Sequence, residues 1–361
     1  MRVPYGELKS LFEAILVKKG FTPEKAGVAA GVFADNSCDG VASHGLNRFP
    51  RFVSYIESGS VDPKAEPELE AAFGALERWN GNLGVGCTNA AFGITRAMEL
   101  AALHGIGCVA MRSTNHWMRG GTYGLMAARA GYAAICWTNT TANVPAWGAK
   151  SCNVGNNPLV MAYPGPEGPM VMDGALAQYS YGALEAAKLD GRELPFPGGF
   201  DRDGKLTADP SAILETQRVL PIGLWKGSGY ALLLDAIGAA LSGGLTVPEV
   251  GRRADETALT QVFIAISLDK TNSRDEVSAM GERLLRDFRA AEPAEEGKPF
   301  FYPGEKAART RRENLELGVP VNEEIWNALK AEAARSPRKI KTTASEIIQT
   351  YGVFGGRFFV P

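Results

Sequence analysis

The stretch Glu99-Leu-Ala-Ala-Leu-His-Gly-Ile-Gly-Cys-Val-Ala-Met111 decides which kind of α/β fold the chain can adopt. Its centre, Gly105-Ile-Gly-Cys-Val-Ala110, formally matches the glycine pattern GxGxxA of dinucleotide-binding loops. In a Rossmann fold this pattern follows a strand and opens a helix, so that the pyrophosphate meets a helix N-terminus. Here an apolar helix ends at His104 and a strand starts at Gly107, which is the reverse order. The sequence therefore favours a helix C-cap at these glycines over a Rossmann site.

The segments on both sides of this stretch alternate between strand-like and helical patterns. Short apolar runs predict strands at Gly107–Met111, Tyr132–Trp137, Asn157–Tyr163, Met170–Met172 and Thr260–Leu268. Helical spacing of apolar residues predicts helices at Asn89–His104, Tyr230–Leu241 and 276–292. Because such alternation is typical of a sheet covered by helices, we expect an α/β fold.

The first 60 residues have a different character and contain only helical patterns. Helices are predicted over 6–19, from Thr22 to about Cys38 and from Phe49 to Gly59, and a proline-rich connector follows at 61–67. We therefore expect a helical N-terminal part at 1–70 and an α/β nucleotide-binding domain at 71–230. A helical C-terminal part at 231–331 is expected to pack with the N-terminal part, and 332–361 to form a disordered tail.

Composition excludes several classes of function. The net charge is 38 − 40 = −2, which indicates neither nucleic acid nor a membrane surface as a partner. No apolar run is long enough to cross a membrane, and the N-terminus does not resemble a signal peptide. The five cysteines form no CxxC pair and have no histidine at ligand spacing, so no metal site is expected. These features favour a cytoplasmic protein.

One of only three histidines, His44, precedes Arg48 by one helical turn. An imidazole can give and take a proton near neutral pH, and a guanidinium binds a carboxylate through two parallel hydrogen bonds. Together they would suit the reduction of a 2-keto acid. A second histidine, His116, lies in a polar, glycine-rich loop after a predicted strand, where α/β proteins place ligands. A structural role is the alternative for both residues, whereas His104 is interpreted as structural.

The segment Leu224–Tyr230 is a second candidate site. A short loop rich in glycine precedes an apolar helix, so free backbone N–H groups and the helix dipole would attract an anion. Lys226 would add a charge, and Trp225 a flat face for a base or a nicotinamide ring. A tight turn that needs small residues is an equally good interpretation of this segment taken alone.

Six blocks of the sequence, in order, resemble one known family. They are SHGLNRFPRF, NHWMRGGTYG, ICWTNTTANVPAWGAK, GNNPLVMAYP, LPIGLWKGSGYALLLD and QVFIAISLDK. They are similar to the malate/L-lactate dehydrogenase family that is unrelated to the Rossmann lactate dehydrogenases, over roughly residues 1–330. The resemblance implies a helical domain, an α/β cofactor domain of non-Rossmann type like that of sulfolactate dehydrogenase, and a homodimer.

The same resemblance implies an NAD(P)-dependent oxidoreductase, with NADH preferred and NADP as the alternative. His44 would be the proton donor, Arg48 the carboxylate ligand and His116 part of the substrate pocket. Nucleotide contacts would fall on Pro169, Met170, Val171, Met172, Asp173, Gly174, Ala175, Trp225, Lys226, Gly304, Glu305 and Lys306.

The expected reaction is reduction of 2,3-diketo-L-gulonate to 3-dehydro-L-gulonate. Dehydrogenation of malate, lactate, ureidoglycolate or sulfolactate, or reduction of a cyclic imino acid, remains the alternative within the family. A carboxylate-binding protein without chemistry is the alternative outside it. After Asp173, where relatives often carry methionine and hydroxyl residues, this chain has Gly-Ala-Leu-Ala-Gln178, which leaves the exact substrate open.

Overall fold

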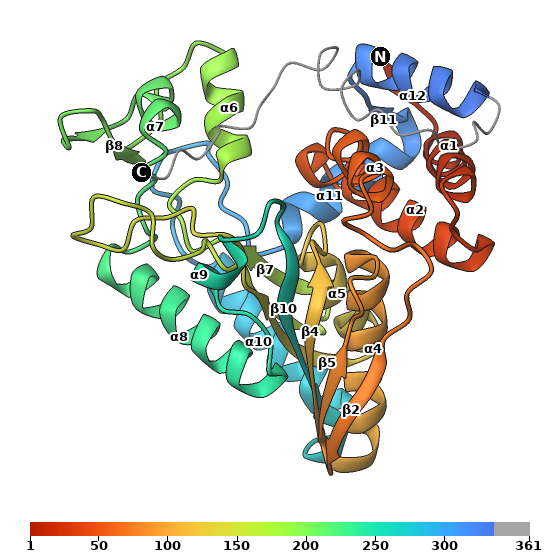
Figure 1. Ribbon diagram of the computed structural model, residues 1–361. Helices are drawn as coiled ribbons and strands as arrows, with labels where there is room; N and C mark the ends of the chain where they lie inside the picture. The colour runs from red at the N-terminus through yellow and green to blue at the C-terminus, as the bar shows by residue number, and fades with distance from the viewer. Residues whose placement is uncertain (336–361) are drawn as a thin grey trace.

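A seven-stranded sheet forms the centre of the structure, a computed structural model that describes residues 1–335 (Figure 1). Its strands are β2 (Glu68–Phe73), β3 (Leu76–Asn80), β4 (Ile106–Asn115), β10 (Thr257–Ser267), β5 (Tyr132–Thr138), β6 (Leu159–Tyr163) and β7 (Met170–Gly174), in their order across the sheet. Only β3 and β4 run parallel, and the other neighbours are antiparallel. The expected α/β fold of non-Rossmann type is confirmed.

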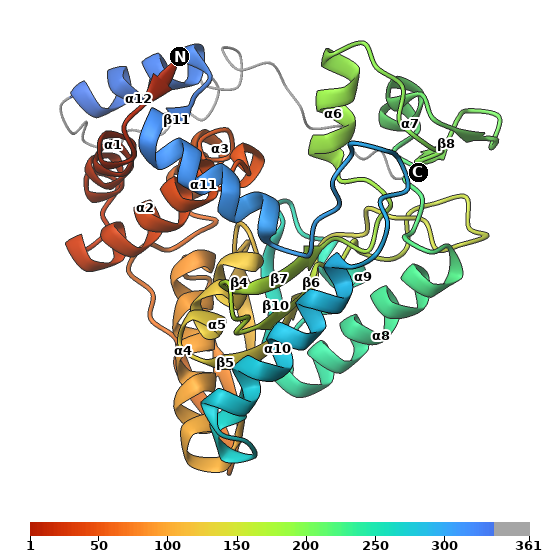
Figure 2. The same ribbon diagram turned by 180° about the vertical axis from the view of Figure 1, so that it is seen from behind.

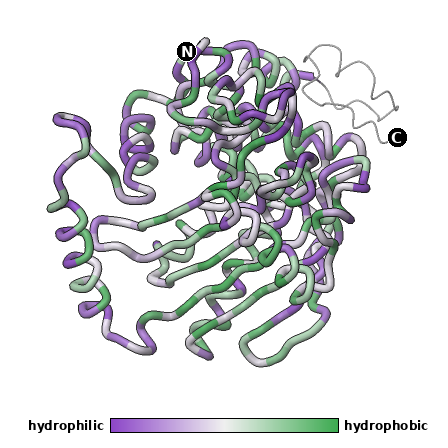
Figure 3. Tube along the Cα trace, turned by 90° about the vertical axis from the view of Figure 1, so that its left-hand side faces the viewer, coloured by the Kyte–Doolittle hydropathy of each residue, from purple (hydrophilic) through white to green (hydrophobic). Residues whose placement is uncertain are grey.

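Helices cover both faces of this sheet (Figures 1 and 2). On one face, α4 (Gly86–His104) and α5 (Gly121–Arg129) bury an apolar core that includes Val109 and Phe263. On the other face, α8 (Trp225–Ser242) crosses β4, β10 and β5. Next to it, α10 (Arg274–Arg289) is attached to β6 by the Tyr163 hydroxyl, which donates to the Val277 carbonyl at 2.9 Å. Figure 3 shows the apolar residues concentrated along the strands.

A helical unit lies beyond the end of the sheet at which β4 finishes (Figure 1). It contains β1 (Arg2–Val3), α1 (Tyr5–Lys18), α2 (Pro23–Cys38), the 3-10 turn η1 (Ala42–His44), α3 (Phe49–Glu57), α11 (Glu305–Leu317), β11 (Val319–Pro320) and α12 (Glu323–Ala334). The rings of Phe12, Phe33 and Phe49 pack against one another at its centre. Pairing of β1 with β11 and packing of α1 on α12 join its two ends.

A smaller lobe follows β7 and lies at the same end of the sheet (Figure 2). It is formed by α6 (Tyr181–Leu189), β8 (Gly199–Phe200), β9 (Leu206–Thr207) and α7 (Pro210–Thr216). Its own apolar core includes Leu184, Ile213 and Val219. The remaining short elements are α9 (Val247–Val250) and the 3-10 turn η2 (Leu268–Lys270).

The structure corrects the expected division of the chain. Residues 231–331 were assigned to a helical C-terminal part, but β10 lies inside the sheet between β4 and β5, and only α11, β11 and α12 return to the N-terminal helices. The predicted tail at 332–361 begins too early, because α12 continues to Ala334, and its remaining part from 336 lies outside the described residues. Gly105 ends α4 with a φ of +85°, as the C-cap interpretation requires.

Among the helices of residues 1–335, none is both long enough and apolar enough to cross a membrane.

Candidate active site

His44 is held in place by α2. The Asn36 side chain donates to the His44 carbonyl at 3.0 Å, and the Leu46 N–H donates to Ser37 Oγ at 2.9 Å. A Cβ at Gly45 would lie 2.2 Å from Ser37 Oγ, so only glycine allows the chain to approach the helix this closely. The SHG motif is therefore fixed by its backbone, and the imidazole is left available.

Two imidazole rings face each other at this point. The His44 and His116 rings are stacked, with centroids 5.7 Å apart and planes 19° apart. Ser43 Oγ lies 3.1 Å from His44 Nδ1, and Met118 N–H donates to His116 Nδ1 at 3.0 Å. Because Nδ1 of His116 accepts a hydrogen bond, the proton of its neutral ring is on Nε2. The structure thus brings together two of the residues predicted to form the site.

Both rings are neutral at pH 7 in this state of the protein. Burial, with the nearby charges of Arg48 and Arg119, lowers the pKa of His44 to about 4. Burial, followed by the charges of Arg48, His44 and Arg51, places the pKa of His116 well below its ordinary value. A neutral imidazole can accept a proton at once, whereas it can donate one only after it has been protonated.

Arg48 precedes α3 and leaves its side chain only 21% exposed. Its nearest carboxylate among the described residues is that of Glu256, at 3.9 Å, which is too long for a hydrogen bond. Burial and the charge of Arg51 lower its pKa, which is a sign of a cation without a close partner. Such a guanidinium can still bind an incoming carboxylate through both of its parallel N–H groups.

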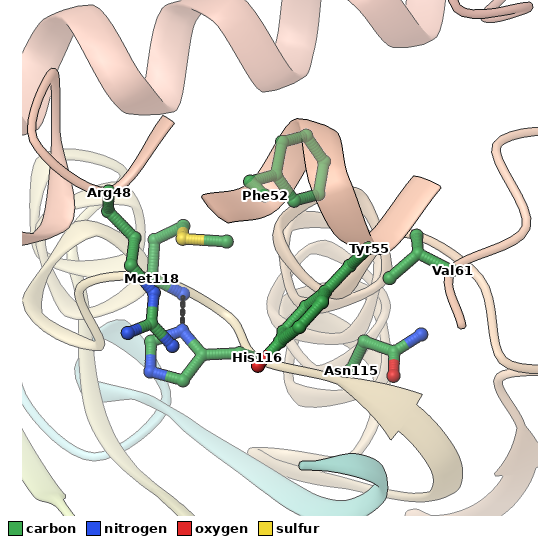
Figure 4. A pocket seen from close by; sticks show the side chains of 7 residues that line it. All are labelled: Arg48, Phe52, Tyr55, Val61, Asn115, His116 and Met118. Atoms are coloured by element: carbon green, nitrogen blue, oxygen red, sulfur yellow. Dashed lines mark hydrogen bonds between the residues drawn. The ribbon is translucent and has the colours of Figure 1, made fainter. Parts of the chain in front are cut away.

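A small pocket adjoins Arg48 and His116 (Figure 4). Its accessible volume is about 10 Å³, which is the space that one water-sized sphere occupies. Residues of α3 and the connector face the end of β4 and the loop after it. The lining residues are Arg48, Phe52, Tyr55, Val61, Asn115, His116 and Met118.

Arg119, whose charge acts on His44, belongs to a network of charged groups. Arg119 Nη1 donates to Asp39, and Arg119 Nε lies 3.8 Å from Asp173 Oδ2. The same Asp173 oxygen accepts the Gly121 N–H at 2.7 Å, at the start of α5. Burial raises the pKa of Asp173, and the Gly121 N–H and Arg119 oppose that rise. Arg119, one of the charges that act on His44, is therefore held between two carboxylates.

Two of the three predicted nucleotide segments lie side by side. The Val171 N–H donates to the Pro303 carbonyl at 3.0 Å, which joins 169–175 to the loop before α11. Gly304 has a φ of +96°, and a Cβ there would lie 3.1 Å from the Val171 nitrogen. Glycine is therefore required at this contact. Asp173 connects the same region to Arg119 and hence to His44.

The third segment, Trp225 and Lys226, begins α8. It is linked to the first, because the Ile222 N–H donates to the Leu176 carbonyl at 3.0 Å. The Trp225 side chain is 66% exposed and offers a flat face to a ring. Met172, in the first segment, is also exposed.

The expectation of free N–H groups at this turn is wrong. The N–H groups of Lys226, Gly227 and Ser228 donate to the carbonyls of Gly223, Ile222 and Leu224. The glycine-rich segment is not a loop but the first turn of α8. A Cβ at Gly227 would lie 2.3 Å from the Ile222 carbonyl oxygen, so the tight turn explains this glycine. The helix dipole and the Lys226 side chain are therefore the features of this turn that could attract an anion.

Sequence reasoning missed Asp39, Glu256 and the roles of Asn115 and Arg119. Asp39 lies close in sequence to the SHG motif, and Asn115 and Arg119 belong to the NHWMRGG block. Their nearness to these motifs could have indicated a role in the site. Glu256 lies before β10 and is far from both blocks in the sequence. Within residues 1–335, no group of three or more His, Cys, Asp or Glu side chains is arranged to hold a metal ion.

Comparison with known sequences identifies a family and a relative of this chain. Residues 3–330 match the model of the family described as malate/L-lactate dehydrogenase. The chain is 43% identical to the 2,3-diketo-L-gulonate reductase of Klebsiella pneumoniae (strain 342), over 92% of this chain and 100% of that protein.

Two solved structures share the fold at similar coverage. Sulfolactate dehydrogenase from Methanocaldococcus jannaschii has a TM-score of 0.85 and 28% identity, over 92% of this chain and 96% of that one. The Δ1-piperideine-2-carboxylate reductase from Pseudomonas syringae pvar. tomato has a TM-score of 0.81 and 28% identity, over 92% and 99%.

Proposed function

Because the chain belongs to the malate/L-lactate dehydrogenase family, we propose that it uses NADH to reduce 2,3-diketo-L-gulonate to 3-dehydro-L-gulonate. The observation that carries the substrate class is Arg48, a mostly buried guanidinium without a close counter-ion beside the stacked imidazole of His44. These two groups match the carboxylate and the carbonyl of a 2-keto acid. The choice of the sugar acid rests on the 43% identity to the Klebsiella reductase.

In the proposed mechanism, Arg48 binds the substrate carboxylate and so orients the adjacent carbonyl toward His44. A bound nicotinamide would supply the hydride that the carbonyl carbon accepts. His44 gives its proton to the oxygen that becomes an alkoxide. Since the substrate carboxylate offsets the charge of Arg48, binding raises the pKa of His44, and the proton is taken up with the substrate.

The three segments 169–175, 225–226 and 304–306 would hold the dinucleotide. Lys226 supplies a charge for a phosphate, and the Trp225 ring a surface for a base or for the nicotinamide. The choice of NADH over NADPH follows the resemblance to the reductase alone, because Glu305 is already paired with Arg289 and the Tyr302 N–H, and its neighbour Lys306 is a cation. A lower Michaelis constant for NADPH than for NADH would overturn this choice.

The outer face of α8 supports a homodimer. Small or polar residues such as Gly227, Ala231 and Gly238 face the sheet, whereas Leu232 and Leu233 are 60% and 59% exposed. A helix with its large apolar side chains outward needs a covering surface. Sedimentation velocity should therefore show a dimer, and Leu233→Asp should shift it toward the monomer.

The five free cysteines support a reducing compartment, which we propose to be the cytoplasm.

A substrate panel tests the proposed reaction. The purified protein would be supplied with NADH and each of 2,3-diketo-L-gulonate, oxaloacetate, pyruvate, 3-sulfopyruvate and Δ1-piperideine-2-carboxylate, while the absorbance of the reduced nicotinamide is followed. Ureidoglycolate would be tested in the oxidative direction with NAD. The highest kcat/KM is expected for 2,3-diketo-L-gulonate. Turnover of none of these compounds would contradict the proposal, and a higher kcat/KM for another would reassign the substrate.

A further inference from the structure

Asn115, which lines the small pocket beside His116, has a buried polar atom without a partner among the described residues. Asn115 is 3% exposed, and its Nδ2 donates to the carbonyls of Leu83 and Gly84 at 2.7 and 2.8 Å. These two bonds fix which end of the amide is nitrogen. Its Oδ1 is buried and has no hydrogen-bond partner among the described residues. A buried amide oxygen normally accepts at least one hydrogen bond, and a water or a group of a bound substrate would supply the donor that the described residues do not.

The surroundings restrict what that donor can be. Phe52, Val61 and Met118 form apolar walls, and the free volume of about 10 Å³ admits a group no larger than a hydroxyl or a methyl. The Tyr55 hydroxyl accepts a hydrogen bond from Arg51 Nε at 3.0 Å, and the Arg51 guanidinium lies 5.4 Å from its ring centroid. This residue is therefore held as a fixed wall of the pocket.

The pocket is adjacent to the position at which the substrate would react. Arg48 and His116 line it, and His116 is stacked on His44. If the carboxylate lies on Arg48 and the carbonyl faces His44, a single group on the carbon next to the keto carbon, such as its hydroxyl, is the part that can enter the pocket.

We propose that Asn115 determines specificity, by accepting a hydrogen bond at Oδ1 from an O–H group on the carbon next to the reacting keto carbon. The inference rests on the proposed function and deepens it. A 3-hydroxy-2-keto acid provides this donor directly. A 2,3-diketo acid provides it when the second ketone is hydrated, because a free ketone offers only an acceptor. A 2-keto acid with a methyl group at this place leaves Asn115 Oδ1 unpaired.

Three small substrates isolate this contact. Glyoxylate, pyruvate and hydroxypyruvate share the carboxylate and the reacting carbonyl and differ only in the third substituent, which is H, CH₃ or CH₂OH. In the wild type, kcat/KM for hydroxypyruvate should exceed that for pyruvate by roughly 10–100-fold, the typical worth of one such hydrogen bond. Asn115→Leu should reduce this ratio to about 1, since no acceptor remains.

Asn314→Leu is the control. Asn314 is also a buried amide, 3% exposed like Asn115, but it lies on α11 and does not line the pocket. Its variant should keep the wild-type preference for hydroxypyruvate over pyruvate. NADH binding, followed by fluorescence, and thermal unfolding would show that each variant is folded.

Val61→Ile tests the proposal without altering Asn115, and decides the matter if Asn115→Leu does not fold. The added methylene should fill the pocket and lower the hydroxypyruvate to glyoxylate ratio of kcat/KM by roughly tenfold or more, because only glyoxylate has no substituent to place there. The inference would be overturned if the variants turn over and neither Asn115→Leu nor Val61→Ile changes the kcat/KM ratios between these keto acids. The pocket would then be assigned to a structural water. The absence of turnover with every keto acid would instead contradict the proposed function.

Discussion

Raising the pH from 5 to 8 should lower kcat/KM for keto-acid reduction about 1,000-fold, or tenfold for each pH unit. The reason is the pKa of His44, which burial and the charges of Arg48 and Arg119 lower to about 4. Above that pH, the protonated fraction of the imidazole falls tenfold per unit and is about 10⁻³ at pH 7. Protonating His44 at pH 7 therefore costs roughly 4 kcal/mol before the substrate binds.

The two directions of the reaction should respond oppositely. Oxidation of the hydroxy acid needs a neutral imidazole as base, so its kcat/KM should rise through pH 4 and stay level above about pH 5. The kcat for reduction should fall at a higher pH than kcat/KM, because the bound carboxylate offsets the charge of Arg48 and raises the pKa of His44. The assay is the initial rate of nicotinamide absorbance change at saturating cofactor, measured in both directions.

His104→Asn is the control, since this third histidine lies at the end of α4 and away from the site. It should leave both profiles unchanged. A reductive kcat/KM that stays level up to pH 6 and declines only above about 6.5 would refute the reasoning. The proton donor would then have an ordinary pKa, and the charges around His44 would have no effect on its protonation.

Three further changes give distinct results. His44→Ala should lower kcat roughly 10²–10⁴-fold with little change in NADH affinity, measured by fluorescence titration, whereas an active residual folded fraction would make His44 a structural residue. Arg48→Lys should mainly raise the KM of the keto acid, by roughly 10–100-fold, because it keeps the charge and loses the paired hydrogen bonds. The free energy of unfolding of the wild type should decrease as the pH falls below about 6.5, because His44 and His116 become protonated in the unfolded chain but stay neutral in the folded one. In urea unfolding, His116→Asn should show a smaller loss over that range, and an equal loss would exclude His116 as a contributor.

Local patterns were sufficient to predict six of the twelve α-helices and five of the seven strands of the central sheet among the described residues, and they excluded a Rossmann site at Gly105. They were insufficient for β2 and β3, because the side chains of β2 are mostly exposed at the edge of the sheet and carry no alternating apolar pattern. The central position of β10 was also beyond local reasoning. Its partners β4 and β5 lie more than a hundred residues earlier, and no local signal specifies a pairing at that separation.

The same limit applies to the site. His44 and Arg48 were predicted together because both lie in one short motif and one helical turn separates them. The two histidines, each with a nearby arginine, suggested a shared site, but the stacking of His116 on His44 depends on how the end of β4 meets the helical unit and could not be predicted. Glu256 and Asp39 act on the charges of the site from other elements, and their roles appear only when the chain is folded.

The charges around His44 explain why substrate and proton should bind together. Arg119 already has Asp39 as a close partner and Asp173 nearby, whereas Arg48 has only Glu256 at 3.9 Å. In the proposed mechanism, the carboxylate of a keto acid is the close counter-ion that Arg48 lacks among the described residues. By linkage, binding of the carboxylate raises the proton affinity of His44 by the same factor by which protonation of His44 raises the affinity for the carboxylate. The dissociation constant of an unreactive carboxylate analogue such as oxamate should consequently increase with pH above 5, and a constant value up to pH 8 would separate binding of the anion from protonation of His44.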